Sequence, residues 1–95
     1  MSPHLRPTRL QPAAVPGYIL VTLPELATVV ELAGLAGLAL YCRVLTRAQT
    51  QRPCFMTTLT CQDPDNTEAL ARAAAALVQA QILTWVDETE EGGVA

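Results

Sequence analysis

The sequence predicts a small α+β domain that is mainly helical, with three helices and a two- or three-stranded sheet. Its 95 residues leave room for one hydrophobic core, and 51% apolar with 16% charged residues is typical of a globular chain. Short β-branched or aromatic runs alternate with longer Ala- and Leu-rich runs. We therefore expect one domain over residues 17–87, a flexible Pro-rich arm over residues 1–16 and an acidic tail over residues 88–95.

The beginning of the domain carries clear start signals. Four prolines among residues 1–16 oppose a helix and favour an extended arm outside the core. The run 18–21 is β-branched and aromatic but too short for a helix, so it predicts a short strand. Thr22 and Glu25 have the spacing of a capping box, in which each side chain bonds the other residue's backbone N–H. A helix is expected to begin there.

Two glycines, Gly34 and Gly37, interrupt the helical pattern that follows. A corner between two helices is the favoured interpretation, and a close contact between packed helices is the alternative. We expect a second helix after the corner. Four of its residues lie on the side predicted to face the core: Leu38, Tyr41, Cys42 and Leu45.

The second half of the chain predicts a strand, a long helix and a closing strand. Residues 54–60 are rich in Thr and alternate apolar with polar positions, which favours a strand. Asp63 is a candidate N-cap for a helix over residues 64–81. Residues 82–86 predict the closing strand. The helix should bury four apolar residues: Leu70, Ala74, Leu77 and Val78.

No group of residues indicates catalysis or a metal site, so we expect neither an enzyme nor a cofactor. His4 is the only histidine, there is no lysine, and no nucleophile, zinc-protease or phosphate-loop motif is present. Helix capping accounts for the acids near residue 64 better than a cation site. The three cysteines form no CxxC pair, and we expect buried reduced thiols rather than a disulfide or metal. They are Cys42, Cys54 and Cys61.

The apolar segments are too short for a membrane span. The longest run between charged residues, Leu32–Cys42, has eleven residues, whereas a span needs about 20. The N-terminal residues lack the compact apolar stretch of a secretory signal. We therefore expect a cytoplasmic protein without a membrane partner.

The order of these elements carries a family resemblance. Helix 38–45 (LALYCRVL) and the junction 76–83 (ALVQAQIL) make residues 17–87 resemble winged-helix domains of phage and plasmid replication or regulatory proteins. The resemblance implies that helix 64–81 enters the DNA major groove, with Asn66, Thr67 and Arg72 nearest the bases. The chain departs from the family where residues 54–62 leave too little room for the usual intermediate helix. Acids at the start of helix 64–81 would also repel phosphates.

Two hypotheses about function follow from the uneven charge, which is +3 over residues 1–62 and −6 over residues 63–95. In the first, a phage or mobile-element protein binds and modulates a host protein, as a regulator or inhibitor. Its contact residues are Asp65, Glu68, Arg72 and Gln79. In the alternative, a winged-helix regulator of transcription or replication binds DNA as a dimer. Its phosphate contacts are Arg6, Arg9, Arg43, Arg47 and Arg52. A homodimer also suits a core this small.

Overall fold

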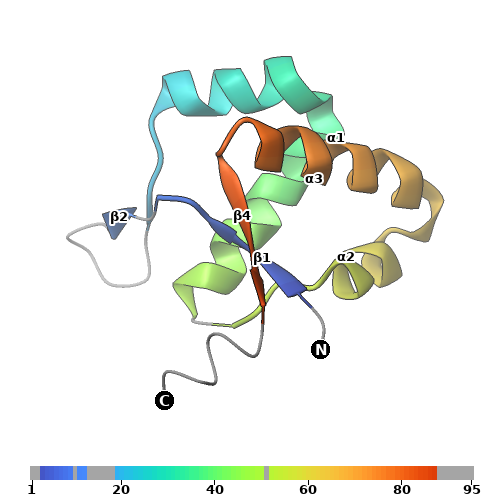
Figure 1. The fold of residues 1–95 in the computed structure, drawn as a ribbon. Coiled ribbons are helices and arrows are strands. Elements are labelled where there is room, and N and C mark those ends of the chain that lie inside the picture. Colours follow the sequence, from blue (N-terminus) through green and yellow to red (C-terminus); the bar gives the residue numbers. More distant parts are fainter. Residues whose placement is uncertain (1–2, 10, 13–18, 51, 88–95) are drawn as a thin grey trace.

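The protein combines three α-helices with two small antiparallel sheets in a computed structural model, which describes residues 3–9, 11–12, 19–50 and 52–87 (Figure 1). This confirms the mainly helical α+β class. In chain order the elements are β1 (Pro3–Pro7), β2 (Gln11–Pro12), β3 (Ile19–Leu20), α1 (Leu23–Gln49), α2 (Met56–Gln62), the 3₁₀ turn η1 (Pro64–Asn66), α3 (Thr67–Gln79) and β4 (Leu83–Asp87).

The strand β1 lies between two partners that are distant from it in the sequence. It pairs with β4 in antiparallel register, with Leu5 opposite Trp85. On its other edge, the Leu5 N–H donates to the carbonyl oxygen of Cys54 at 2.9 Å. Leu5 is only 2% exposed and belongs to the core. The prediction that residues 1–16 lie outside the core is therefore wrong for the strand β1.

Strand alternation explains how a proline-containing segment can pair inside a sheet. Peptide groups of successive residues point to opposite edges, and the Leu5 N–H points toward Cys54. Pro3 and Pro7 lie two residues away on either side, so the N–H groups they lack also belong to that edge. The pairing with β4 loses no donor, because His4 and Arg6 direct their N–H groups there.

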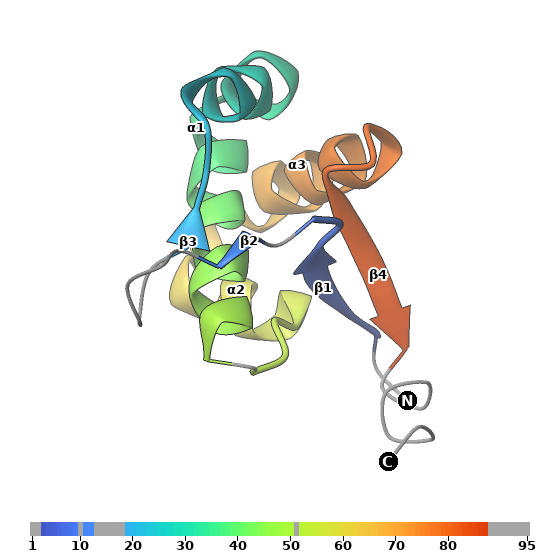
Figure 2. The same cartoon turned by 90° about the vertical axis from the view of Figure 1, so that its left-hand side faces the viewer.

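The helix α1 turns sharply at Gly34, as predicted. Gly34 has φ 67° and ψ −163°, a conformation that only glycine adopts readily. Figure 2 shows the first part of α1 at the top of the molecule and the second part running down from it. Gly37 fits the alternative interpretation at the corner itself, since a Cβ there would overlap the Cβ of Ala33 in the first part of α1, whereas the Cβ of Ala73 in α3 would be at an ordinary contact distance of 3.8 Å. One glycine makes the corner, and the other permits the two parts of α1 to approach closely at Ala33.

The start of α1 is fixed by half of the predicted capping box. The Thr22 hydroxyl accepts the backbone N–H of Glu25 at 3.3 Å. The Glu25 carboxylate turns elsewhere and accepts the phenol O–H of Tyr41 at 2.8 Å. Tyr41 lies beyond the corner and is 2% exposed. Burial, reinforced by the bond to Glu25 and its negative charge, raises the pKa of Tyr41 well above its ordinary range. This hydrogen bond ties the two parts of α1 together.

The core lies between the second part of α1, α3 and the β1–β4 sheet (Figure 1). Its helical residues include Leu40, Tyr41, Val44, Leu70, Ala73, Ala74 and Leu77. Three predicted core residues are placed differently, and the first of them, Leu38, is only partly buried. Cys42 is exposed, because the buried side of α1 is centred on Leu40 and Val44. Val78 is only partly buried at the edge of the core.

The predicted strand over residues 54–60 is wrong. Residues 56–62 form α2, and only Cys54 makes a strand-like bridge, with Leu5. Phe55 and Leu59 are four residues apart, a spacing that fits a helix as well as a strand. Burial of Leu59, which is 1% exposed, favours the helical arrangement. Tertiary packing thus decided between two local patterns.

The remaining elements follow their predictions, with changes at their ends. The closing strand is present as β4, and the first predicted strand is reduced to β3, which pairs with β2. The Asp63 carboxylate accepts the side-chain N–H of Asn66 at 2.9 Å and makes no cap bond to the backbone. The predicted cap is therefore absent, and α3 begins only after η1.

Replacing Tyr41 by Phe should lower the free energy of unfolding by about 1–2 kcal/mol at neutral pH, because Glu25 loses its donor. Above pH ~10 an unfolded chain releases the phenol proton that the folded chain retains, so the stability owed to Tyr41 declines. The difference between the two proteins should therefore shrink at high pH. Urea unfolding at neutral and high pH measures both effects, with Thr46→Ala as the exposed-hydroxyl control. Equal stability at neutral pH would contradict this assignment.

Candidate interaction surfaces

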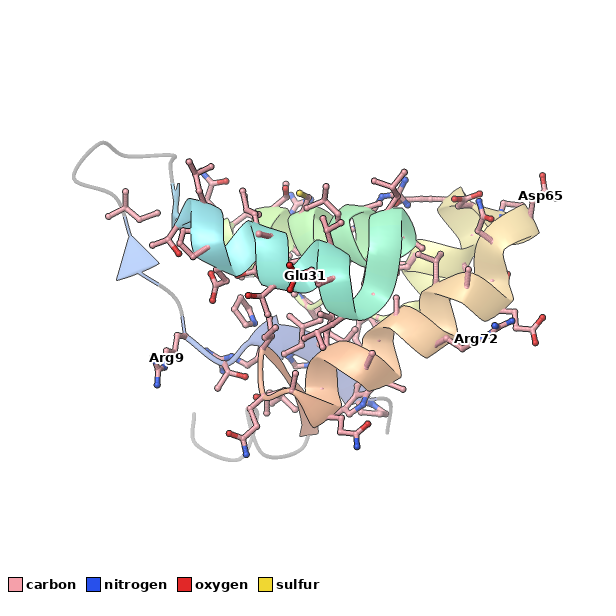
Figure 3. The ribbon with its side chains drawn as sticks, turned by 90° about the horizontal axis from the view of Figure 1, so that it is seen from above. Arg9, Glu31, Asp65 and Arg72 are labelled. Carbon is pink, nitrogen blue, oxygen red and sulfur yellow. The ribbon has the colours of Figure 1, made fainter. Side chains whose placement is uncertain are left out.

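The predicted partner-binding residues lie on one exposed side of η1 and α3, which we call the α3 face: Asp65, Glu68, Arg72 and Gln79. Helical spacing aligns the last three. Glu68 and Arg72 form an ion pair at 3.3 Å, with both side chains more than three-quarters exposed. Figure 3 shows Arg72 and Asp65 on the outside of the molecule. An ion pair this exposed contributes little stability. Both groups are therefore accessible to a partner.

The predicted phosphate-contact arginines come from two regions of the chain. Arg43 and Arg47 are half-buried on the second part of α1, and Arg43 donates from Nη1 to the side-chain oxygen of Gln62 at 3.1 Å. Arg52 follows this helix and is exposed. The remaining two, Arg6 and Arg9, are exposed on or just beyond β1. Figure 3 places Arg9 at the opposite end of the molecule from Arg72.

The three thiols are free, but only Cys54 is buried; Cys42 and Cys61 are exposed, contrary to prediction. Burial raises the pKa of Cys54, and the positive charges of Arg47 and Arg43 oppose that shift in part. A thiol held protonated is a poor nucleophile and a poor metal ligand. Within the described ranges, no three His, Cys, Asp or Glu side chains gather as a metal site would require.

An apolar surface that sequence analysis missed lies on and beside the first part of α1. We call it the α1 surface, and it comprises Leu20, Leu23, Val30, Leu32 and Leu35. Leu23 is 80% exposed and Leu35 78% exposed. Helical spacing puts Leu23 and Val30 on one side of the helix and Leu32 on the opposite side, so the exposed apolar residues lie on two sides of this segment. Several such residues in one short segment exceed the scattered single ones that are ordinary on a protein surface. This surface is the strongest candidate for binding.

The composition of the helix explains why this surface is apolar. A helix at the edge of a soluble domain normally buries one side and places charged residues on the other. Residues 23–33 include two ionisable side chains, and one of them, Glu25, is bonded to Tyr41. Glu31 is the other, and it is exposed (Figure 3). The signal available in the sequence was a helix with few charged residues and many large apolar ones.

By length and composition alone, α1 could cross a membrane, since its 27 residues extend beyond the eleven-residue run considered above. This is weak evidence, because the core helix of a soluble protein can meet the same criterion. The second part of α1 supplies Leu40, Tyr41 and Val44 to the core. Gly34 also breaks the helix within the apolar segment.

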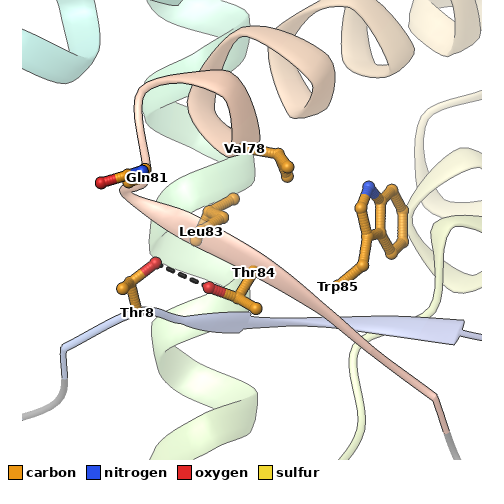
Figure 4. A pocket seen from close by; sticks show the side chains of 6 residues that line it. All are labelled: Thr8, Val78, Gln81, Leu83, Thr84 and Trp85. Atoms are coloured by element: carbon orange, nitrogen blue, oxygen red, sulfur yellow. Dashed lines mark hydrogen bonds between the residues drawn. The ribbon is translucent and has the colours of Figure 1, made fainter.

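A shallow groove of about 370 Å³ lies beside the start of β4 (Figure 4). Its walls come from the end of α3, the following turn, β4 and Thr8, and its lining residues are Thr8, Val78, Gln81, Leu83, Thr84 and Trp85. The hydroxyls of Thr8 and Thr84 lie 2.8 Å apart. Trp85 is 41% exposed. The groove therefore presents an aromatic wall with a few neutral polar groups.

Comparisons with known proteins identify no relative: no protein-family model matches the chain, and neither a curated protein nor a solved structure is significantly similar.

Proposed function

We propose that the protein is a non-enzymatic protein-interaction module that docks on another protein through the α1 surface. The observation that carries this proposal is the exposure of five large apolar side chains around one short helical segment. Burying such side chains against a partner removes apolar area from water and favours association. The module would thus regulate its partner by occupying a surface, without chemistry of its own.

The spacing of the exposed residues supports a partner that offers an apolar groove to the first part of α1. Leu23 and Val30 are seven residues apart, so they lie on the same side of the helix two turns from one another. An amphipathic helix that docks in a groove uses anchors at this spacing. Glu31 is exposed next to Val30 in the sequence, and a basic group at the rim of the groove would complement it.

The α3 face supplies a second contact surface in this proposal. Its groups are polar and exposed, which is typical of the rim of an interface rather than its centre. Rim charges mostly affect the rate of association and the choice of partner. Changes there should alter affinity less than changes on the α1 surface.

A library of random peptides about four helical turns long, selected against the protein, tests which surface binds. We expect amphipathic, apolar peptides whose Kd rises at least about tenfold in the variant carrying Leu23→Glu and Leu35→Glu. The matched control is Glu68→Arg, which changes an equally exposed residue of α3 and should leave the Kd almost unchanged. Titration calorimetry measures both. Peptides whose binding depends on Glu68 and tolerates the α1 changes would contradict the assignment.

The helical arrangement favours a second candidate, the winged-helix DNA-binding regulator. The helix α2 occupies the segment thought too short for the intermediate helix, so one objection to the resemblance is removed. The electrostatic objection remains, because α3 presents Glu68 beside Arg72, and η1 adds Asp65. We therefore place this candidate second.

Binding to a mixed pool of duplex DNA separates the two candidates. A regulator that contacts several phosphates should give a gel shift at low salt that weakens steeply at physiological salt. In that case the double variant Arg43→Ala with Arg47→Ala should abolish the shift. The variant Arg72→Ala tests whether α3 also contacts the DNA. The protein-interaction proposal expects no salt-sensitive shift even at low salt. Observing one that depends on Arg43 and Arg47 would favour the regulator.

A further inference from the structure

The outer edge of β4 presents backbone groups that pair with no strand among the described residues. Leu5 directs its N–H away from β4, and residues opposite one another in an antiparallel pair share this orientation. Trp85, which lies opposite Leu5, therefore directs its N–H and C=O away from β1. The same holds for the peptide groups of Leu83 and Asp87, two residues to either side. Among the described residues, β1 is the one strand paired with β4.

This edge lacks the features that usually prevent strand pairing. Proteins protect exposed edges with proline, lysine, bulges or covering loops. The far edge of β1 has such protection, since Pro3 and Pro7 flank its one bond to Cys54. The five residues of β4 include no proline and no basic residue. One edge of the sheet is blocked and the other remains able to accept a strand.

The side chains next to the open edge fit a second strand. Trp85 is on the same side of the sheet as Leu5, but it is 41% exposed. Val78 and Trp85 form walls of the shallow groove beside β4 (Figure 4). Strand addition combines backbone hydrogen bonds with pockets for alternate side chains, and both are present at this edge.

We propose that β4 of one molecule pairs antiparallel with β4 of a second copy of this chain. A two-fold axis at Trp85 would place the two tryptophans opposite each other and Leu83 opposite the second copy's Asp87. All the outward peptide groups of β4 are then paired, giving a continuous four-stranded sheet. Aromatic pairs on neighbouring strands are favourable, and the tryptophans lose their exposure.

Charge favours a second copy in this orientation over another extended chain. The sequence after Asp87 adds Glu88, Glu90 and Glu91. At the opposite end of β4, Thr8 bonds to the carbonyl of Ile82, so the exposed Arg9 follows directly beside the start of the strand. Antiparallel self-pairing brings the acidic end of each β4 to the Arg9 end of the other, and parallel pairing would place the acidic ends together.

Amide hydrogen exchange of the full chain at micromolar and millimolar concentration tests the pairing. The amides of Thr84 and Val86 face β1 and should be protected at both concentrations. Those of Trp85 and Asp87 should be protected only at the higher concentration, where sedimentation should detect a dimer. A chain that remains monomeric at millimolar concentration overturns the proposal. So does a dimer in which the Trp85 amide exchanges rapidly.

Charge reversal tests the orientation. Arg9→Glu should weaken dimerisation about tenfold at low salt, and adding Glu88→Arg with Glu90→Arg should restore it. Arg52→Glu, an exposed arginine beyond α1, is the control and should have little effect. No response to Arg9→Glu overturns the antiparallel arrangement. A third outcome is a dimer that Leu23→Glu abolishes and in which the amides of Trp85 and Asp87 exchange rapidly. That outcome would overturn this inference, and it would leave the α1 surface as an interaction site.

Discussion

The fold depends on the placement of Leu5 between Cys54 and β4. The backbone of Leu5 bonds Cys54 on one edge, the neighbouring residues pair with β4 on the other, and its side chain fills the core. These contacts join the first residues of the chain to the last described ones. Closing so long a loop costs chain entropy, which the burial of Leu5 and Leu83 must offset. The helices between them pack on the sheet that results.

The corner at Gly34 links this core to the candidate binding surface. Beyond the corner, the second part of α1 packs on α3, and Gly37 leaves room for Ala33 of the first part. Before the corner, the helix buries Val29 in the core but also exposes apolar side chains to solvent. The bond between Glu25 and Tyr41 holds that part in place. A surface fixed in advance loses less entropy on binding than a flexible one.

Sequence analysis succeeded where structure depends on neighbouring residues. The Thr22 cap, the corner at Gly34, the helix α3 and the strand β4 all have local signals, and each was located to within a few residues. Helical spacing also placed Glu68 and Arg72 together on an exposed side. Whether these two residues contact a partner stays a prediction.

The errors came from long-range contacts that no local pattern reports. The strand β1 exists because of partners about 50 and 80 residues away, as the pairs of Leu5 with Cys54 and Trp85 illustrate. The segment of α2 has a spacing that fits either type of structure, and packing of Leu59 decided it. The α1 surface was missed because periodicity assigns apolar residues to a core, although Leu23 and Leu35 do not reach it.

The most direct test of this account removes β1. Deleting residues 1–9 should abolish the cooperative urea transition followed by helical circular dichroism, because the core loses Leu5 and β4 loses its partner. Deleting only residues 1–2 leaves β1 intact and serves as the control. If the protein without residues 1–9 has a urea transition with the same midpoint and steepness as the full chain, the central role of β1 is contradicted.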